Sequence, residues 1–96
     1  MKIIKRNGSE AVFDITKIIS AITKANKVVP EAQRLTKQQI IEISDHVQEV
    51  CYARGHAMNV EEIQDIVEDA IMATGAYEVA RKYITYRYVQ SLSLIH

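Results

Sequence analysis

Three basic residues near the start of the chain are the first candidates for chemistry. Lys5 and Arg6 are adjacent and come immediately before the dipeptide Asn7-Gly8, and Lys17 follows further along the chain. Ammonium and guanidinium groups beside a tight turn suit a phosphate, because they form charge-assisted hydrogen bonds with its oxygens. More often, such a pair is simply two solvated cations at the end of an exposed strand. The pair alone leaves both interpretations open.

Lys17 lies in the first turn of a helix that the apolar spacing predicts over residues 15–27. The helix macrodipole disfavours a cation there, so we expect another group to stabilise the charge. If the preceding hairpin folds over this helix end, Lys17 meets Lys5 and Arg6 near backbone N–H groups that bind anions well. Lys5 and Arg6 can both reach one pocket only where the strand ends or twists, because successive strand residues face opposite sides.

A second group of basic residues lies among the tyrosines near the end of the chain. Arg81, Lys82 and Arg87 stand where they could stack on a base or contact a phosphate. Tyr83 falls on the apolar stripe of a predicted helix, and we interpret it as a core residue. Arg87 falls on the same stripe, and burying an unpaired guanidinium is costly. It therefore needs either an acidic partner or a ligand.

The other reactive side chains form no recognisable catalytic or metal-binding set. His46 and His56 lack the spacing of metal ligands, and Cys51 sits in an apolar helical pattern typical of a buried thiol. The chain contains neither a phosphate-loop motif nor a dinucleotide-binding glycine motif. The carboxylates of the predicted helices are interpreted as solvated faces. We therefore expect a domain that is not itself an enzyme and that has no metal site.

The composition restricts the partners. The 96 residues are 48% hydrophobic and 25% charged, which is typical of one folded domain. Twelve basic and twelve acidic residues give a formal net charge of zero, so no overall field favours nucleic acid or an anionic membrane. The sequence shows no signal peptide and no apolar run long enough for a membrane span. We expect a cytoplasmic protein that binds neither nucleic acid nor membrane directly.

Turn and cap signals indicate the elements that position these residues. Runs rich in Ile and Val at residues 2–5 and 10–13 flank Asn7-Gly8, a pair that tolerates positive φ, and this predicts a β-hairpin. Asp14 is the predicted N-cap of the helix over 15–27. The proline-containing segment 28–35 is predicted to be a linker between helices.

Three more helices and one short strand follow. A helix over 37–53 is predicted from the capping box of Thr36 and Gln39, with Gly55 at its end. The remaining elements are a short strand within 56–60, a helix from a second capping box at Asn59 and Glu62 to Gly75, and a helix over 76–92.

This order predicts an α+β fold, a four-helix bundle capped by a small N-terminal β-hairpin or three-stranded sheet, because two strands alone are not stable in water. Residues 1–90 are the predicted domain. The tail 91–96 has no stop signal, so we interpret it as the start of a linker to a missing domain.

Three segments together resemble the ATP-cone, a regulatory domain of ribonucleotide reductases. They are IIKRNGSEAVFDITKI, VEEIQDIVEDAI and VARKYITYR, in this order, and the resemblance covers Ile3 to about Tyr88. The last segment is most similar to the anaerobic class of the enzyme. The resemblance implies the same bundle and cap, and a site under the cap for which ATP and dATP compete, with Mg²⁺.

The resemblance also assigns residues to that site. It implies phosphate contacts for Lys5, Arg6 and Lys17 and a place for Ile18 in the base or sugar pocket. The remaining residues assigned to the site are the turn residues Asn7 and Gly8, the third-helix residue Gln64 and the fourth-helix residue Arg87. Asn7 replaces an acid often found before the turn glycine, and both residue types favour the turn.

The function implied is an allosteric switch: ATP leaves a parent ribonucleoside-triphosphate reductase active and dATP inhibits it, through oligomerisation or docking on the catalytic domain. Two alternatives stay open. The domain could be the cone of a nucleotide-responsive transcriptional repressor, although no zinc-ribbon cysteine pairs are present. It could also be a helical interaction module with no ligand.

Overall fold

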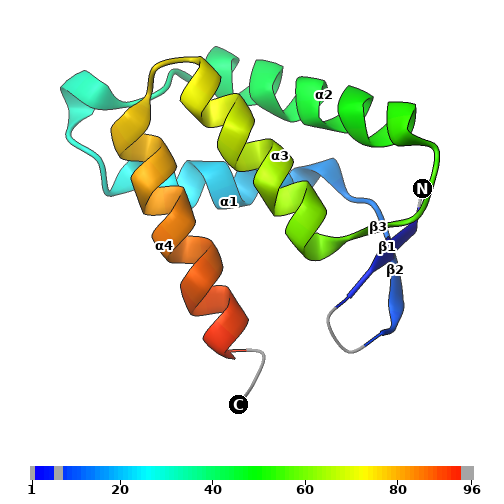
Figure 1. Cartoon of the computed structure of the whole chain (residues 1–96). Helices are drawn as coiled ribbons and strands as arrows, with labels where there is room; N and C mark the ends of the chain where they lie inside the picture. Colours follow the sequence, from blue (N-terminus) through cyan, green and yellow to red (C-terminus); the bar gives the residue numbers. More distant parts are fainter. Residues whose placement is uncertain (1, 6–7, 94–96) are drawn as a thin grey trace.

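Four helices and one small sheet make up the described part of the chain (Figure 1). A computed structural model describes residues 2–5 and 8–93, with side chains up to residue 87. The elements in chain order are β1 Lys2–Ile4, β2 Glu10–Val12, α1 Ile15–Lys27, the 3₁₀-helix η1 Glu31–Gln33, α2 Lys37–Arg54, β3 Met58–Asn59, α3 Val60–Ala73 and α4 Tyr77–Ser93. The predicted α+β fold and the predicted order of elements are confirmed.

The sheet has the strand order β2-β1-β3. β1 pairs with β2 in antiparallel orientation, with Ile3 opposite Ala11, and with β3 in parallel orientation, with Ile3 opposite Met58. Gly8 N–H donates to the Lys5 carbonyl over 2.9 Å, and Gly8 has a φ of 84°. This left-handed conformation is the reason that the turn requires glycine.

Caps set the helix ends largely as predicted. The Thr36 hydroxyl accepts from Gln39 N–H and the Gln39 side chain accepts from Thr36 N–H, which completes the capping box of α2. Asn59 caps α3 by accepting from Glu62 N–H over 2.8 Å. The prediction of a second capping box is therefore wrong in its reciprocal half, because the Glu62 carboxylate lies 3.8 Å from Arg54 and makes an ion pair there.

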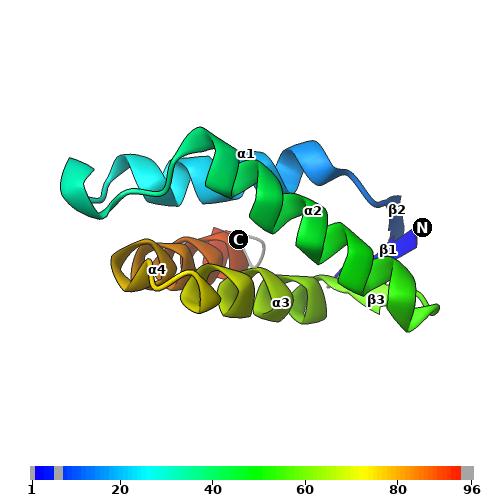
Figure 2. The same cartoon turned by 90° about the horizontal axis from the view of Figure 1, so that it is seen from above.

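The helices form a closed bundle in which α1 and α3 each pack against both α2 and α4. The sheet lies at one end of this bundle, where α3 begins (Figures 1 and 2). The core residue Ile22 and the β3 residue Met58 are fully buried. Cys51 is also buried, as predicted.

The segment 28–35 does more than connect helices. Val29 and Leu35 are buried, and Asn26 holds Leu35 by accepting from its N–H and donating to its carbonyl. At the other end of the chain α4 continues to Ser93, so the boundary at residue 90 stays a prediction. No helix in the described residues is long and apolar enough to cross a membrane.

Candidate functional site

A cavity of about 210 Å³ lies between the sheet and the helices. Ile3 of β1 and Lys5, which directly follows this strand, line it, as do Ala11 of β2 and Phe13, which directly follows that strand. Residues two positions apart in a strand share one face, so the side that packs Ile3 on the core also directs Lys5 toward the helices. The hairpin thus brings a cation to a mainly apolar hollow.

The two walls of the cavity come from α1 and α3. Their residues recur at steps of three and four, which places them on one face of each helix. The wall residues are Asp14, Lys17, Ile18 and Ala21 at the start of α1, and Val60, Ile63, Gln64 and Val67 on α3. Tyr83 of α4 completes the lining.

Two ammonium groups belong to this lining. Lys5 and Lys17 are both solvent-exposed residues that line the cavity, and Ile18 lies beside Lys17. The hairpin therefore folds over the start of α1, which is the arrangement that brings these lysines together. Of the other predicted site residues in the hairpin, Arg6 and Asn7 lie outside the described residues, and Gly8 lies in the turn and does not line the cavity.

Asp14 caps the start of α1 and takes up backbone N–H groups there. Thr16 N–H donates to the Asp14 carboxylate over 3.0 Å, and Lys17 N–H donates to the Asp14 carbonyl over 3.1 Å. The side-chain hydrogen bond from Thr16 lowers the pKa of Asp14, so this carboxylate is ionised at neutral pH. The helix cap thus uses the N–H groups of Thr16 and Lys17, which agrees with the prediction of Asp14 as the N-cap.

Gln64 lines the cavity and carries a buried acceptor atom without a partner. Its Oε1 atom is buried and has no hydrogen-bond partner among the described residues, and it is the one buried side-chain polar atom there with this property. Buried polar atoms are nearly always paired in folded proteins. An amide oxygen left without a partner beside a hollow suits a ligand that donates a hydrogen bond.

Tyr83 has a role at the cavity that the sequence did not reveal. Only 4% of its surface is exposed, which confirms its predicted place in the core, yet it also lines the cavity. Burial raises the pKa of Tyr83 far above that of a free tyrosine, so its hydroxyl is protonated at neutral pH. An apolar stripe predicts burial of a residue but cannot show that a hollow adjoins it.

Arg87 is not part of the cavity lining. Its Nη1 atom donates to Asp65 Oδ1 over 2.8 Å and to Glu68 Oε1 over 3.1 Å. Burial lowers the pKa of Arg87, but the hydrogen bonds and charges of Asp65 and Glu68 more than offset this, so the pKa is raised. Of the two partners that the sequence allowed for Arg87, the structure shows acidic ones.

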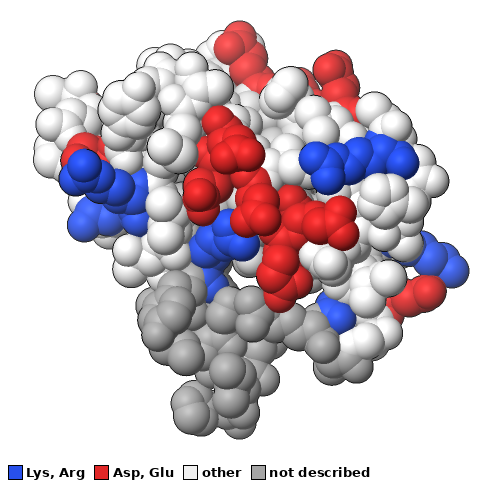
Figure 3. Space-filling view, in the orientation of Figure 1, with Lys and Arg blue, Asp and Glu red and all other residues white. Residues whose placement is uncertain are grey.

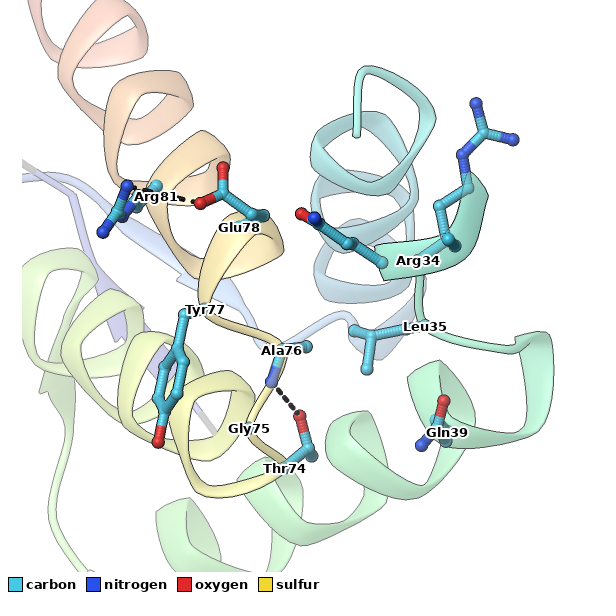
Figure 4. Close-up of a pocket in the computed structure, with 11 residues that line it drawn as sticks. Arg34, Leu35, Gln39, Thr74, Gly75, Ala76, Tyr77, Glu78 and Arg81 are labelled. Atoms are coloured by element: carbon cyan, nitrogen blue, oxygen red, sulfur yellow. Dashed lines mark hydrogen bonds and ion pairs between the residues drawn. The ribbon is translucent and has the colours of Figure 1, made fainter. Parts of the chain in front are cut away.

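A larger hollow of about 520 Å³ lies at the opposite end of the bundle, around the turn between α3 and α4 (Figure 4). Both arginines in its lining already have protein partners. Arg34 donates to the carbonyls of Val29 and Lys27, and Arg81 lies 3.3 Å from Glu78. Figure 4 shows the Arg34 guanidinium directed away from the hollow. Tyr77 in its lining is 60% exposed. The hollow is larger than the cavity under the sheet but lacks a buried unpaired group, so the cavity under the sheet is the better candidate site.

The fold is that of a small α+β domain with a hollow of about 210 Å³ beneath its sheet. The chain belongs to the ATP-cone family: the family model "ATP cone domain" matches residues 1–92. Nucleotide binding and allosteric regulation are general properties of domains in this family.

The chain is also similar in sequence to several ribonucleotide reductases. The chain is 41% identical over 91 residues to a ribonucleoside-diphosphate reductase subunit alpha from Chlamydia pneumoniae, an alignment that covers 88% of this chain. It is 39% identical over 92 residues, 95% of this chain, to an anaerobic ribonucleoside-triphosphate reductase from Haemophilus influenzae. A vitamin B12-dependent ribonucleoside-diphosphate reductase from Thermoplasma acidophilum is 31% identical over 96 residues, 90% of this chain.

These alignments cover 9%, 13% and 11% of the respective relatives. The chain thus corresponds to about a tenth of each reductase. The catalytic function named for those proteins concerns chains far longer than this one.

Proposed function

We propose that the cavity under the sheet binds ATP or dATP and that the domain reports this nucleotide state to a ribonucleotide reductase. The observation that carries the proposal is that one cavity is lined by Lys5, which directly follows β1, by Lys17 of α1 and by Gln64 of α3. The hollow of about 210 Å³ is smaller than the roughly 300 Å³ at which pockets for drug-sized ligands begin. A base and sugar would fill it and leave the phosphates at the open rim.

The charges of the rim suit this orientation. Lys5 and Lys17 are exposed there and would contact phosphate oxygens. We include Arg6, Asn7 and Gly8 in the proposed site on the family resemblance. Ile18 would pack against the base or sugar inside the cavity. Gln64 would accept a hydrogen bond from a donor group of the ligand.

Magnesium, in this proposal, is held mainly by the phosphates. The described residues contain no group of three or more side chains suited to hold a metal ion. Asp14 is the one carboxylate of the cavity lining, and its oxygen already accepts from Thr16. Mg²⁺ commonly binds through substrate phosphates and few protein ligands, which fits such a site.

The regulatory step would follow from a difference in affinity between two states of the parent enzyme. ATP would favour the active state and dATP the inhibited state, and the two nucleotides differ only in the 2′-hydroxyl. A ligand shifts such an equilibrium only by its differential affinity. The partners we propose are the catalytic part of the reductase and a second copy of the domain.

Calorimetric titration of the 96-residue chain with ATP, dATP and GTP, with and without Mg²⁺, tests the proposal. We expect adenine nucleotides to bind more tightly than GTP. Lys5→Ala and Lys17→Ala should each weaken ATP binding roughly tenfold, because each removes a charged hydrogen bond. Lys37→Ala, an exposed lysine at the start of α2, is the matched control and should leave binding unchanged. No heat with any nucleotide from folded protein would favour an interaction module without a ligand.

A further inference from the structure

Arg87 links the two helices that carry Gln64 and Tyr83. It stands on α4 one turn after Tyr83, and its two carboxylate partners stand on α3, Asp65 directly after Gln64 and Glu68 one turn further. The Arg87 side chain is 18% exposed and that of Glu68 is 26% exposed, so this ion pair is largely shielded from water, whereas Asp65 is 69% exposed. Pairs of this kind constrain geometry more than surface pairs do.

The charge around Arg87 does not favour a phosphate. One guanidinium faces two carboxylates, at 2.8 Å and 3.1 Å, so the three groups together carry a net negative charge. Figure 3 shows acidic side chains gathered over α3, the helix that supplies both partners. A polyanion approaching this point would meet repulsion from α3.

We propose that Arg87 is a positioning residue for the nucleotide site. It fixes α4 to α3 through Asp65 and Glu68, and in this way holds Tyr83 and Gln64 in place at the cavity without touching the nucleotide. This inference rests on the proposed function. The arginine of the YITYR segment, Arg87, thus has the role of joining α3 and α4, the two helices that carry Gln64 and Tyr83.

Glu68→Gln distinguishes two roles of Arg87, positioning the cavity and contacting a phosphate. The first role predicts weaker ATP binding in this variant, and the second predicts stronger binding. If Arg87 positions the cavity, Glu68→Gln and Arg87→Gln loosen the same link, and both weaken ATP binding by about fivefold. If Arg87 contacts a phosphate, Glu68→Gln removes a competing negative charge and strengthens ATP binding, while Arg87→Gln weakens it. Asp69→Asn, an exposed acid on the same helix, corrects for the general effect of losing a negative charge.

Double variants test whether the effect acts through Gln64. In a Gln64→Leu background, the further change Arg87→Gln should cost less than twofold in ATP affinity, because there is no longer an amide to hold in place. Thermal unfolding of every variant confirms that folded protein is compared.

The outcomes separate the inference from the proposed function. If the unaltered chain binds no nucleotide, the proposed function fails and the inference fails with it. If the unaltered chain binds ATP but Glu68→Gln strengthens binding, or Arg87→Gln leaves it unchanged, the inference alone is overturned. Equal weakening by Glu68→Gln and Arg87→Gln, absent in Asp69→Asn, is the result that supports it.

Discussion

Gln64 carries a cost in stability that ligand binding would offset under the proposed function. Its Oε1 atom is buried without a partner among the described residues, and an unpaired buried acceptor costs about 1–3 kcal/mol. Ligand binding would recover part of this cost by supplying a donor. The residue is therefore expected to respond in opposite directions in a stability assay and in a binding assay.

Gln64→Leu should weaken ATP binding while leaving the free energy of unfolding of the ligand-free chain unchanged or higher. Leucine has a similar size and brings no unpaired oxygen into the cavity. Urea unfolding and calorimetric titration of the same preparation measure the two quantities. The control is Gln48→Leu on α2, which is outside the cavity lining. This variant should bind ATP as tightly as the unaltered chain does. A large loss of stability in Gln64→Leu would show that the amide is satisfied in the ligand-free protein.

Helix boundaries were the part of the structure most open to prediction from sequence, because caps are local. Asp14, Thr36 and Asn59 were each predicted as N-caps, and each side chain accepts a backbone hydrogen bond in the structure. Gly55 likewise has the left-handed conformation expected at the end of α2. Sequence patterns missed the partner of the Glu62 carboxylate, which lies 3.8 Å from Arg54 of α2, because no local pattern reveals a contact between two helices.

Thr36→Ala should destabilise the chain by about 1 kcal/mol, because it removes the hydroxyl that caps the start of α2. Gln39→Ala should have a smaller effect, since only the reciprocal bond is lost. Denaturant unfolding provides both values. Ser20→Ala, an exposed change inside α1, is expected to cause no loss, and equal loss in all three variants would refute the capping explanation.

The candidate site depends on the whole molecule: residue patterns suggested that Lys5 and Lys17 could meet, but only the family resemblance assigned Gln64 to the same site. Lys5, Lys17 and Gln64 become neighbours because the sheet closes one end of the bundle, and none of these contacts is local in sequence. Residue patterns could not show that Arg87 would find Asp65 and Glu68 on another helix. Nor could they show which end of the bundle would hold the better site.

Stability of the whole domain should decrease as the pH rises above about 9. Burial raises the pKa of the Cys51 thiol and of the Tyr83 hydroxyl above their usual values of 9.0 and 10.0. Below those values both groups are protonated in the folded and unfolded states. Above them the unfolded chain loses protons that the folded chain retains, so unfolding becomes more favourable.

Urea unfolding at neutral and alkaline pH measures this effect. Tyr83→Phe and Cys51→Ala should each make the alkaline loss of stability shallower, and Tyr52→Phe, an exposed tyrosine, should not. An alkaline loss in Tyr83→Phe as steep as in the unaltered chain would contradict the burial explanation for this residue.

The central claim, that a nucleotide binds under the sheet, is tested most directly by following backbone amide NMR signals while ATP is added to the labelled chain. The account predicts progressive shifts for Lys5, Lys17 and Gln64, which share the cavity, and little change around the larger hollow at Thr74 and Arg81. Shifts confined to Thr74 and Arg81, or no shifts at saturating ATP, would contradict it.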